Sequence, residues 1–368
     1  MNFIFYPIES RIFDFLVFPS LISEKERYEK SKEEDGFKVP YFSDYLDLLN
    51  RVEVQLEPYI KDINIYYMNN LHREYDFIDM ISSLYMIFGH KSEKEYLDML
   101  LGLDDKDIIK SIAYSIISDN ENSVNYSEEL MNRAKALSLN KSELISLIKD
   151  LPTEASSKWN LFLIIEEPVK YMKMYVDLMY KVLPIFTDFY KSYEEEVGRY
   201  GQYLAEFLNE NGAKGLEEKT YSILDSKILN DEENRILISS VLQYGIFITG
   251  AGQYSYMSWG LKMDEAFKIM KEANENKINE RVQVFKNLGD KTRYEVVRLI
   301  ASGQTSTKEI AQALGVSSAT ISYHLNNLLQ AKIIKIDRTD NRYGYVVDHE
   351  LLELICNELM KDLNNLKN

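Results

Sequence analysis

The sequence predicts a mainly α-helical protein. It has a large helical N-terminal domain, which contains a small β-sheet, and a smaller C-terminal domain of short helices and a hairpin. Three observations support this fold class. A length of 368 residues is too great for one ordinary domain. Apolar residues recur at three- and four-residue spacing along most of the chain, as they do on one face of a helix. Charge is distributed unevenly between the two ends.

The first elements are predicted from apolar runs and proline positions. Residues 2–6 are apolar after Asn2 and indicate a short strand that ends at Pro7. A largely helical stretch then runs from Glu9 to about Lys32, with a kink or a fresh start at Pro19, since proline disrupts a helix interior. Further helices are expected over residues 42–70, 73–89, 92–101, 105–118, 126–138 and 140–149.

The second half of the N-terminal domain has a helical sequence pattern first and a strand-like pattern after it. Residues 158–211 are almost wholly helical in pattern, with breaks or bends expected at Pro168 and Pro184, and a turn follows at 209–215. The stretch 232–260 is rich in β-branched and aromatic residues and predicts two short strands. These strands could pair with the N-terminal strand in one small sheet.

Helix returns over 261–278, and we place the domain junction inside it. Residues 1–270 then form a mostly helical N-terminal domain, and residues 271–368 form a C-terminal domain.

Capping residues outline the helices of the C-terminal domain. Asp290 can cap a helix that runs to about Ala301. Ser306 and Glu309 form an S-x-x-E capping box at the start of the next helix, and Gly315 stands where a glycine ends it. Two short helices separated by such a turn are typical of a helix-turn-helix, here about 306–331.

The residues after this motif predict a wing. Ser317 caps the second helix, about 318–331, which in such motifs enters the major groove. Two strand-like runs with a polar tip follow over about 333–347, and an amphipathic helix closes the chain over 349–366. The expected C-terminal fold is therefore a winged helix-turn-helix. It makes residues 271–368 a DNA-binding domain and leaves residues 1–270 as an effector or dimerisation domain.

Residues 284–347 resemble the winged-helix domain of the ArsR-type (arsenical-resistance repressor) family of bacterial regulators. The resemblance is carried by "LGDKTRYEVVRLI" (288–300), "TKEIAQALGVSSATISYHLNNLLQAKII" (307–334) and "RTDNRYGYVV" (338–347). It implies a transcriptional regulator, in the first place a repressor, that binds an inverted-repeat operator as a homodimer. It also implies that the flanking helices, around 278–288 and 349–366, pair in that dimer.

Hydroxyl, amide and basic side chains on the motif and the wing are the expected DNA ligands. They are Lys308, Ser317, Ser318, Thr320, Ser322, Tyr323, Asn326, Arg338, Asn341 and Arg342. The competing interpretation is a solvated helix face and, for the two arginines, surface ion pairs with Asp337 or Asp340. Of Asn326 and Asn327 we expect only one to face DNA. Arg293 is expected to be structural, and three residues are expected in the core: Ile321, Leu325 and Leu328.

The net charge at first argues against a partner that is itself negative, because 43 Lys and Arg face 59 Asp and Glu, a total of −16. From Arg281 to Asp348, however, ten basic residues face six acidic ones, so this segment carries +4 and the remainder carries −20. A mildly basic module is thus attached to a strongly acidic one. The acidic part must face away from DNA or tune its binding.

Composition and motifs exclude several other classes. A single cysteine, Cys356, excludes an intramolecular disulfide and a multi-cysteine zinc site, and it fits a cytoplasmic protein. Many ArsR-type proteins sense metals through cysteines, but "STKEIAQAL" (306–314) has none, so we expect no metal and no cofactor. His349 is expected to begin the last helix. No segment is long and apolar enough to indicate a membrane span.

The N-terminal domain carries no phosphate-binding, nucleophile or metalloprotease motif, so we expect no enzyme. Its aromatic and Met-rich segment 158–190 could line an apolar effector pocket, although such a segment is more often plain core. The residues expected there are Trp159, Tyr171, Tyr175, Tyr180 and Phe186. A small-molecule or protein effector would act through this domain. The alternative function is an enzyme or a protein-docking domain with an appended DNA-binding module.

Overall fold

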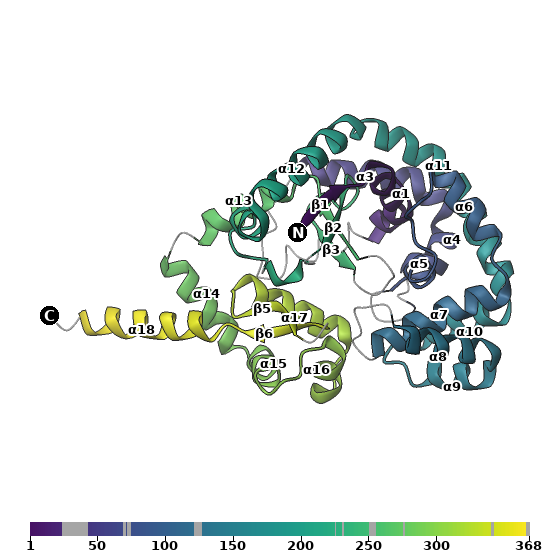
Figure 1. Ribbon diagram of the computed structural model, residues 1–368. Helices are drawn as coiled ribbons and strands as arrows, with labels where there is room; N and C mark the ends of the chain where they lie inside the picture. Colours follow the sequence, from purple (N-terminus) through teal and green to yellow (C-terminus); the bar gives the residue numbers. More distant parts are fainter. Residues whose placement is uncertain are drawn as a thin grey trace. The chain divides into compact units, whose positions relative to one another are not determined.

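The computed structural model describes residues 1–368 with the exception of 24–42, 69–70, 72–74, 121–126, 225, 230–231, 250–254, 275–276, 340–341 and 366–368 (Figure 1). The described residues form two compact units. The first contains residues of 1–210 and 232–263, and the second contains those of 211–230 and 264–368. The second unit therefore includes a segment that precedes the last strands of the first.

The first unit contains a four-stranded sheet in the order β1-β2-β4-β3. β1 (Asn2–Phe5) and β4 (Tyr256–Gly260) both run parallel to β2 (Glu233–Ser239), and β3 (Ile246–Thr249) lies antiparallel on β4. The predicted N-terminal strand and its pairing with the later strands are confirmed. Two strands were predicted over residues 232–260, but the residues that the structure describes there form three. The glycine-containing segment after β2 turns the chain back, so that it forms an additional strand.

The first helix confirms the effect of proline on its length. α1 (Pro7–Val17) ends just before Pro19, which lies in the short 3-10 turn η1 (Phe18–Ser20). The part of the predicted helix beyond residue 23 lies outside the described residues.

Helices form most of the rest of the first unit. They are α3 (Ser43–Leu56), η2 (Glu57–Tyr59), α4 (Ile60–Ile63), η3 (Asn64–Met68), α5 (Phe77–Ser82), α6 (Glu93–Leu101), α7 (Asp105–Asn120), α8 (Glu128–Leu139), α9 (Lys141–Lys149), α10 (Ala155–Glu166), α11 (Pro168–Lys191) and α12 (Glu194–Lys219), whose last turns belong to the second unit. Most of the predicted helical segments are confirmed.

Two helix predictions were wrong in part. The helix expected over 73–89 is confined to α5, because tertiary contacts hold the following turn: the Tyr85 hydroxyl donates to Asp107, and its carbonyl accepts from Tyr96. Pro168 begins α11, but Pro184 does not break it. Pro184 is exposed, so water can satisfy the carbonyl that its missing N–H leaves behind.

The turn expected at 209–215 is confirmed at Gly212. The span labelled α12 consists of two helices that meet there in a kink, because a φ of 57° and a ψ of −147° distort the backbone away from the helical conformation. Positive φ is accessible to glycine without steric cost, which explains why the distortion occurs at this residue.

A buried carboxylate joins α1 to the end of β2. Asp14 is fully buried and accepts hydrogen bonds from the Ser239 hydroxyl (2.5 Å), the Ser240 amide (2.7 Å) and the Ser240 hydroxyl (2.6 Å). Burial raises the pKa of Asp14 to about 6, although these hydrogen bonds favour its charged form. The contact fixes the first helix against the central strand.

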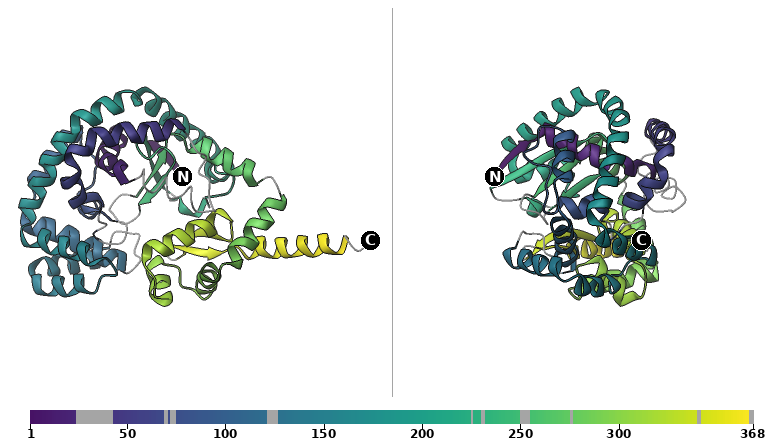
Figure 2. Two further views of the ribbon diagram at one scale, coloured as in Figure 1. Left: turned by 180° about the vertical axis from the view of Figure 1, so that it is seen from behind. Right: turned by 90° about the vertical axis from the view of Figure 1, so that its right-hand side faces the viewer.

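The second unit contains α13 (Met263–Asn274), α14 (Lys277–Gly289), α15 (Lys291–Ala301), α16 (Thr307–Leu314), α17 (Ser318–Gln330), β5 (Ile334–Thr339), β6 (Arg342–Val347) and α18 (His349–Asn365). β5 and β6 form an antiparallel pair directly after α17, as predicted for the wing. The left-hand view in Figure 2 shows α18 as a long helix that extends beyond the rest of this unit. The predicted boundaries of α14 to α18 and of the wing are correct to within one or two residues, whereas α13 ends at Asn274, before the predicted residue 278.

Candidate nucleic-acid interface

The helices of the motif begin and end at the capping residues that the sequence indicates. The Asp290 carboxylate accepts from the Arg293 amide at 2.8 Å, and the Ser306 hydroxyl accepts from the Glu309 amide at 3.3 Å. Gly315, which ends α16, has φ of +68°. The Ser317 hydroxyl accepts from the Thr320 amide at 3.1 Å and so satisfies the first turn of α17. The turn geometry between α16 and α17 is therefore fixed locally.

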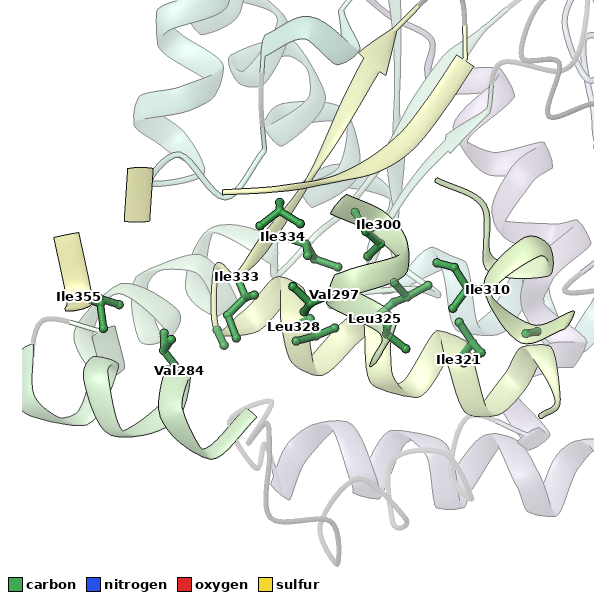
Figure 3. Packing of buried hydrophobic residues seen from close by; sticks show 14 residues of the cluster. Val284, Val297, Ile300, Ile310, Ile321, Leu325, Leu328, Ile333, Ile334 and Ile355 are labelled. Carbon is green, nitrogen blue, oxygen red and sulfur yellow. The ribbon is translucent and has the colours of Figure 1, made fainter. Parts of the chain in front are cut away.

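One face of α17 is core. Ile321, Leu325 and Leu328 are all 0% exposed, as predicted, and they pack with Val297 and Ile310 of the two preceding helices (Figure 3). Each such side chain contributes about 1.5–3 kcal/mol by leaving water. This packing determines which side of α17 remains outside.

The opposite side of α17 carries the predicted DNA ligands. Ser317 and Asn326 are exposed, and Thr320, Ser322 and Tyr323 are partly exposed. Their exposure is compatible with contacts to a groove, and it leaves their proposed roles as predictions.

Some of these groups also have partners within the helix. The Thr320 hydroxyl lies 2.8 Å from the Ser317 hydroxyl, so the two bind each other before any DNA arrives. The Ser318 hydroxyl oxygen is buried and is turned away from the surface. Asn326 is exposed and Asn327 is 6% exposed, so only one of the two asparagines is presented.

The strand register of the wing places its two arginines close to the tip of the hairpin. Arg338 pairs with Tyr343 and Thr339 pairs with Arg342, so both arginines lie at the outer end of the hairpin. Asn341, predicted at the tip, lies outside the described residues. Lys308 is partly exposed in the first turn of α16.

Several basic residues of this unit are used in ion pairs. Arg293, expected to be structural, donates from Nε to the Asn287 carbonyl at 3.3 Å, and its Nη2 lies 4.0 Å from Asp290. Further pairs join Arg281 to Glu358 at 3.8 Å, Arg298 to Glu295 at 3.5 Å, Lys332 to Glu280 at 3.7 Å and Lys335 to Asp348 at 3.5 Å. The local positive charge is therefore partly neutralised.

Comparison with known proteins agrees with this geometry. Residues 288–337 match the family model of a helix-turn-helix domain. Transcriptional repressor SdpR of Bacillus subtilis is 31% identical over 81 residues, which are 22% of this chain and 90% of that protein. The chain belongs, through its C-terminal winged helix, to the ArsR-type family of transcriptional regulators. It is therefore a DNA-binding transcriptional regulator.

Two further ArsR-type relatives also match only a part of this chain. The arsenical resistance operon repressor of Staphylococcus xylosus is 25% identical over 76 residues, 21% of this chain and 73% of that protein. The regulator KmtR of Mycobacterium tuberculosis is 30% identical over 69 residues, 19% of this chain and 53% of that protein. Each match covers about a fifth of this chain.

The metal-sensing residues of the ArsR-type family have no counterpart in α16, which lacks cysteine. Cys356 is an exposed thiol on α18. Asp348 caps α18 by accepting from the Leu351 amide at 3.0 Å, and His349 is the first residue of that helix, as predicted. Within the described ranges, no three His, Cys, Asp or Glu residues are grouped so that they could hold a metal ion.

The residues predicted for an effector pocket do not gather in one place. Tyr175 and Phe186 are fully buried on α11, whereas Trp159 is 63% exposed on α10. Tyr180 donates to Asp98 at 2.9 Å, and the Tyr171 carbonyl accepts from Tyr66 at 2.9 Å.

The aromatic residues around Tyr175 were not singled out from the sequence. Its ring contacts those of Tyr66 and Phe77, and its hydroxyl lies 3.0 Å from that of Tyr67. Both tyrosines come from the π-helical turn η3, an irregularity that periodicity does not reveal. In the part of the chain that the structure describes, no helix combines the length and the apolar character needed to cross a bilayer.

Proposed function

We propose that the protein is a sequence-specific repressor that binds an inverted-repeat operator as a homodimer, and that its N-terminal domain modulates DNA affinity. The observation that carries the proposal is the orientation of α17. Its apolar face is buried, whereas Thr320, Tyr323 and Asn326 keep exposed surface, and a hairpin that bears two arginines follows immediately. A helix so placed can read base edges while the hairpin holds phosphates.

Exposed apolar side chains on two helices support the homodimer. Val284 and Ile355 join α14 and α18 to the winged-helix core. Beyond this core, several large apolar side chains of the same two helices remain 36–56% exposed. They are Val282, Phe285, Leu354, Met360 and Leu363. A second copy of the chain, related by a two-fold axis, would cover apolar side chains of these helices and double the basic surface offered to DNA.

The acidic N-terminal domain supports modulation rather than catalysis. Residues 1–270 carry a net charge of −17, which repels phosphates within the screening length. An effector that shifts this domain would change DNA affinity through differential binding to two states. The ArsR-type relatives named above are regulators, which favours this function over an enzyme with an appended DNA-binding module.

A binding experiment tests the proposal. Duplexes selected from a random-sequence pool by the wild-type protein should share an inverted repeat, and their affinity should fall steeply between 50 and 200 mM salt, roughly a thousandfold or more for six or more phosphate contacts. Replacing Thr320 and Tyr323 with Ala should weaken the selected duplex more than an unrelated one. Selection of no common sequence, or equal weakening on both duplexes, would contradict specific recognition by α17.

A further inference from the structure

Gly344 allows an unusually close contact between the wing and the helix-turn-helix. It is buried in the middle of β6, opposite Asp337 of β5. A Cβ atom at this position would lie 2.6 Å from Thr305 Cβ, 2.9 Å from its Oγ1 and 3.3 Å from its Cγ2. In real proteins, a Cβ atom essentially never lies within 3.0 Å of a heavy atom outside its own residue and the two adjacent residues. Only glycine therefore permits the observed separation.

Thr305 belongs to the turn that joins α15 to α16. Its carbonyl accepts from the Tyr345 amide at 3.3 Å, so the turn is attached to β6 by its backbone as well. Ser306, the next residue, caps α16. The atoms that Gly344 faces are thus close to the backbone and cannot move away as the end of a flexible side chain could. Any side chain at 344 would push β6 away from the helix-turn-helix.

We infer that Gly344 is a positioning residue for DNA binding. Because it has no side chain, β6 can pack directly against Thr305, and this short separation positions the wing so that Arg338 and Arg342 reach phosphates while α17 lies in the groove. The inference rests on the proposed function. The register supports it, because Arg342 lies two residues before Gly344, and Arg338 is the residue after Asp337, which pairs with Gly344. A glycine inside a strand commonly marks a close backbone approach.

The test compares Gly344→Ala with the wild type on the duplex selected by the wild type. We expect affinity to fall at least tenfold at 150 mM salt. The slope of log affinity against log salt should also decrease by about 0.9 for each phosphate that the wing no longer neutralises. Gly289→Ala is the matched control, because nothing lies within 4 Å of a Cβ at that glycine of the same unit. It should bind like the wild type.

Second-site variants separate positioning from a simple decrease in stability. Thr305→Gly removes the Cβ atom that the new methyl group would meet, so the double variant with Gly344→Ala should recover both the affinity and the salt slope. Thr305→Ala keeps that Cβ atom and should not restore them. Thermal unfolding of each full-length variant is measured in parallel. A purely structural defect lowers the midpoint of unfolding, but the protein that remains folded still shows the wild-type slope of log affinity against log salt.

The outcomes distinguish the inference from the function on which it rests. A wild-type slope in Gly344→Ala, or equal rescue by Thr305→Ala and Thr305→Gly, would overturn the positioning role while leaving specific DNA binding intact. Failure of the wild type to select any duplex would instead overturn the proposed function itself.

Discussion

Ser317 shows how one residue joins folding to function. Its hydroxyl accepts from the Thr320 amide, and it also lies 2.8 Å from the Thr320 hydroxyl at the exposed start of α17. A residue that must hold the first turn cannot also move freely toward a base. We therefore expect Ser317 to act on DNA mainly by orienting Thr320.

Replacing Ser317 with Ala should destabilise the protein by about 1 kcal/mol, because the first turn of α17 loses its side-chain acceptor. Ser317→Asn should retain most of that stability, since asparagine caps helices about equally well. Urea denaturation of the full-length variants measures both. Equal stability of the Ala and Asn variants would show that the cap contributes nothing.

Asp14 should make stability depend on pH in a particular direction. Its pKa is about 6 when folded and about 4 when unfolded, so the folded state binds more protons between these values. The contribution of this group to stability is therefore fully present below about pH 4 and is lost as pH rises through about 6.

The variant Asp14→Asn lacks this titration. The difference in unfolding free energy between wild type and Asp14→Asn should accordingly fall by up to about 3 kcal/mol from pH 4 to pH 7. Denaturation curves of both proteins at several pH values test this. A difference that stays constant or grows with pH would refute the raised pKa.

At the scale of the elements, α17 was predictable because local and tertiary signals agree. Ser317, Gly315 and the spacing of Ile321, Leu325 and Leu328 all indicate the same helix boundaries and the same buried face. The contact between Gly344 and Thr305 was not, since the two residues are 39 positions apart and only the packed structure brings them together.

The core face of α17 gives a prediction of stability. Leu325→Ala should cost about 2–5 kcal/mol, because the side chain is fully buried and its removal leaves a cavity. Leu325→Met, which nearly conserves volume, should cost less than about 1.5 kcal/mol. Chemical denaturation measures both, and similar destabilisation by the two variants would show that the site does not depend on packed volume.

The exposed apolar side chains of α18 give a prediction of assembly. Leu354→Asp with Leu363→Asp should convert the proposed dimer into monomers and lower operator affinity at least tenfold, because two charges would be buried in an apolar interface. Light scattering gives the mass. Leu139→Asp, on the 67% exposed Leu139 of α8, is the control and should leave the mass unchanged. A wild-type mass equal to one chain would remove the basis for the dimer.

The whole molecule was harder to predict than its C-terminal part. Residues 2–6 were expected to pair with later strands, and β1 does lie parallel to β2. The aromatic residues of the segment 158–190 were open to two interpretations, and the burial of Tyr175 on α11 with the exposure of Trp159 on α10 shows that they are not one surface. Periodicity indicates which side of a helix is buried but not which helix covers it, so an effector site stays a prediction.

The winged helix is interleaved with the rest of the chain. Residues 211–230 belong to the second unit although β2 and β4, which follow them, belong to the first. Within this segment Ile228 and Leu229 are buried, and η4 (Ser226–Ile228) lies against β5 of the wing. The winged-helix unit therefore cannot be separated from the rest of the protein by cutting the chain at one position. Grafting it onto another sensor would require two junctions, and a fragment that begins at residue 264 would lack part of its own packing.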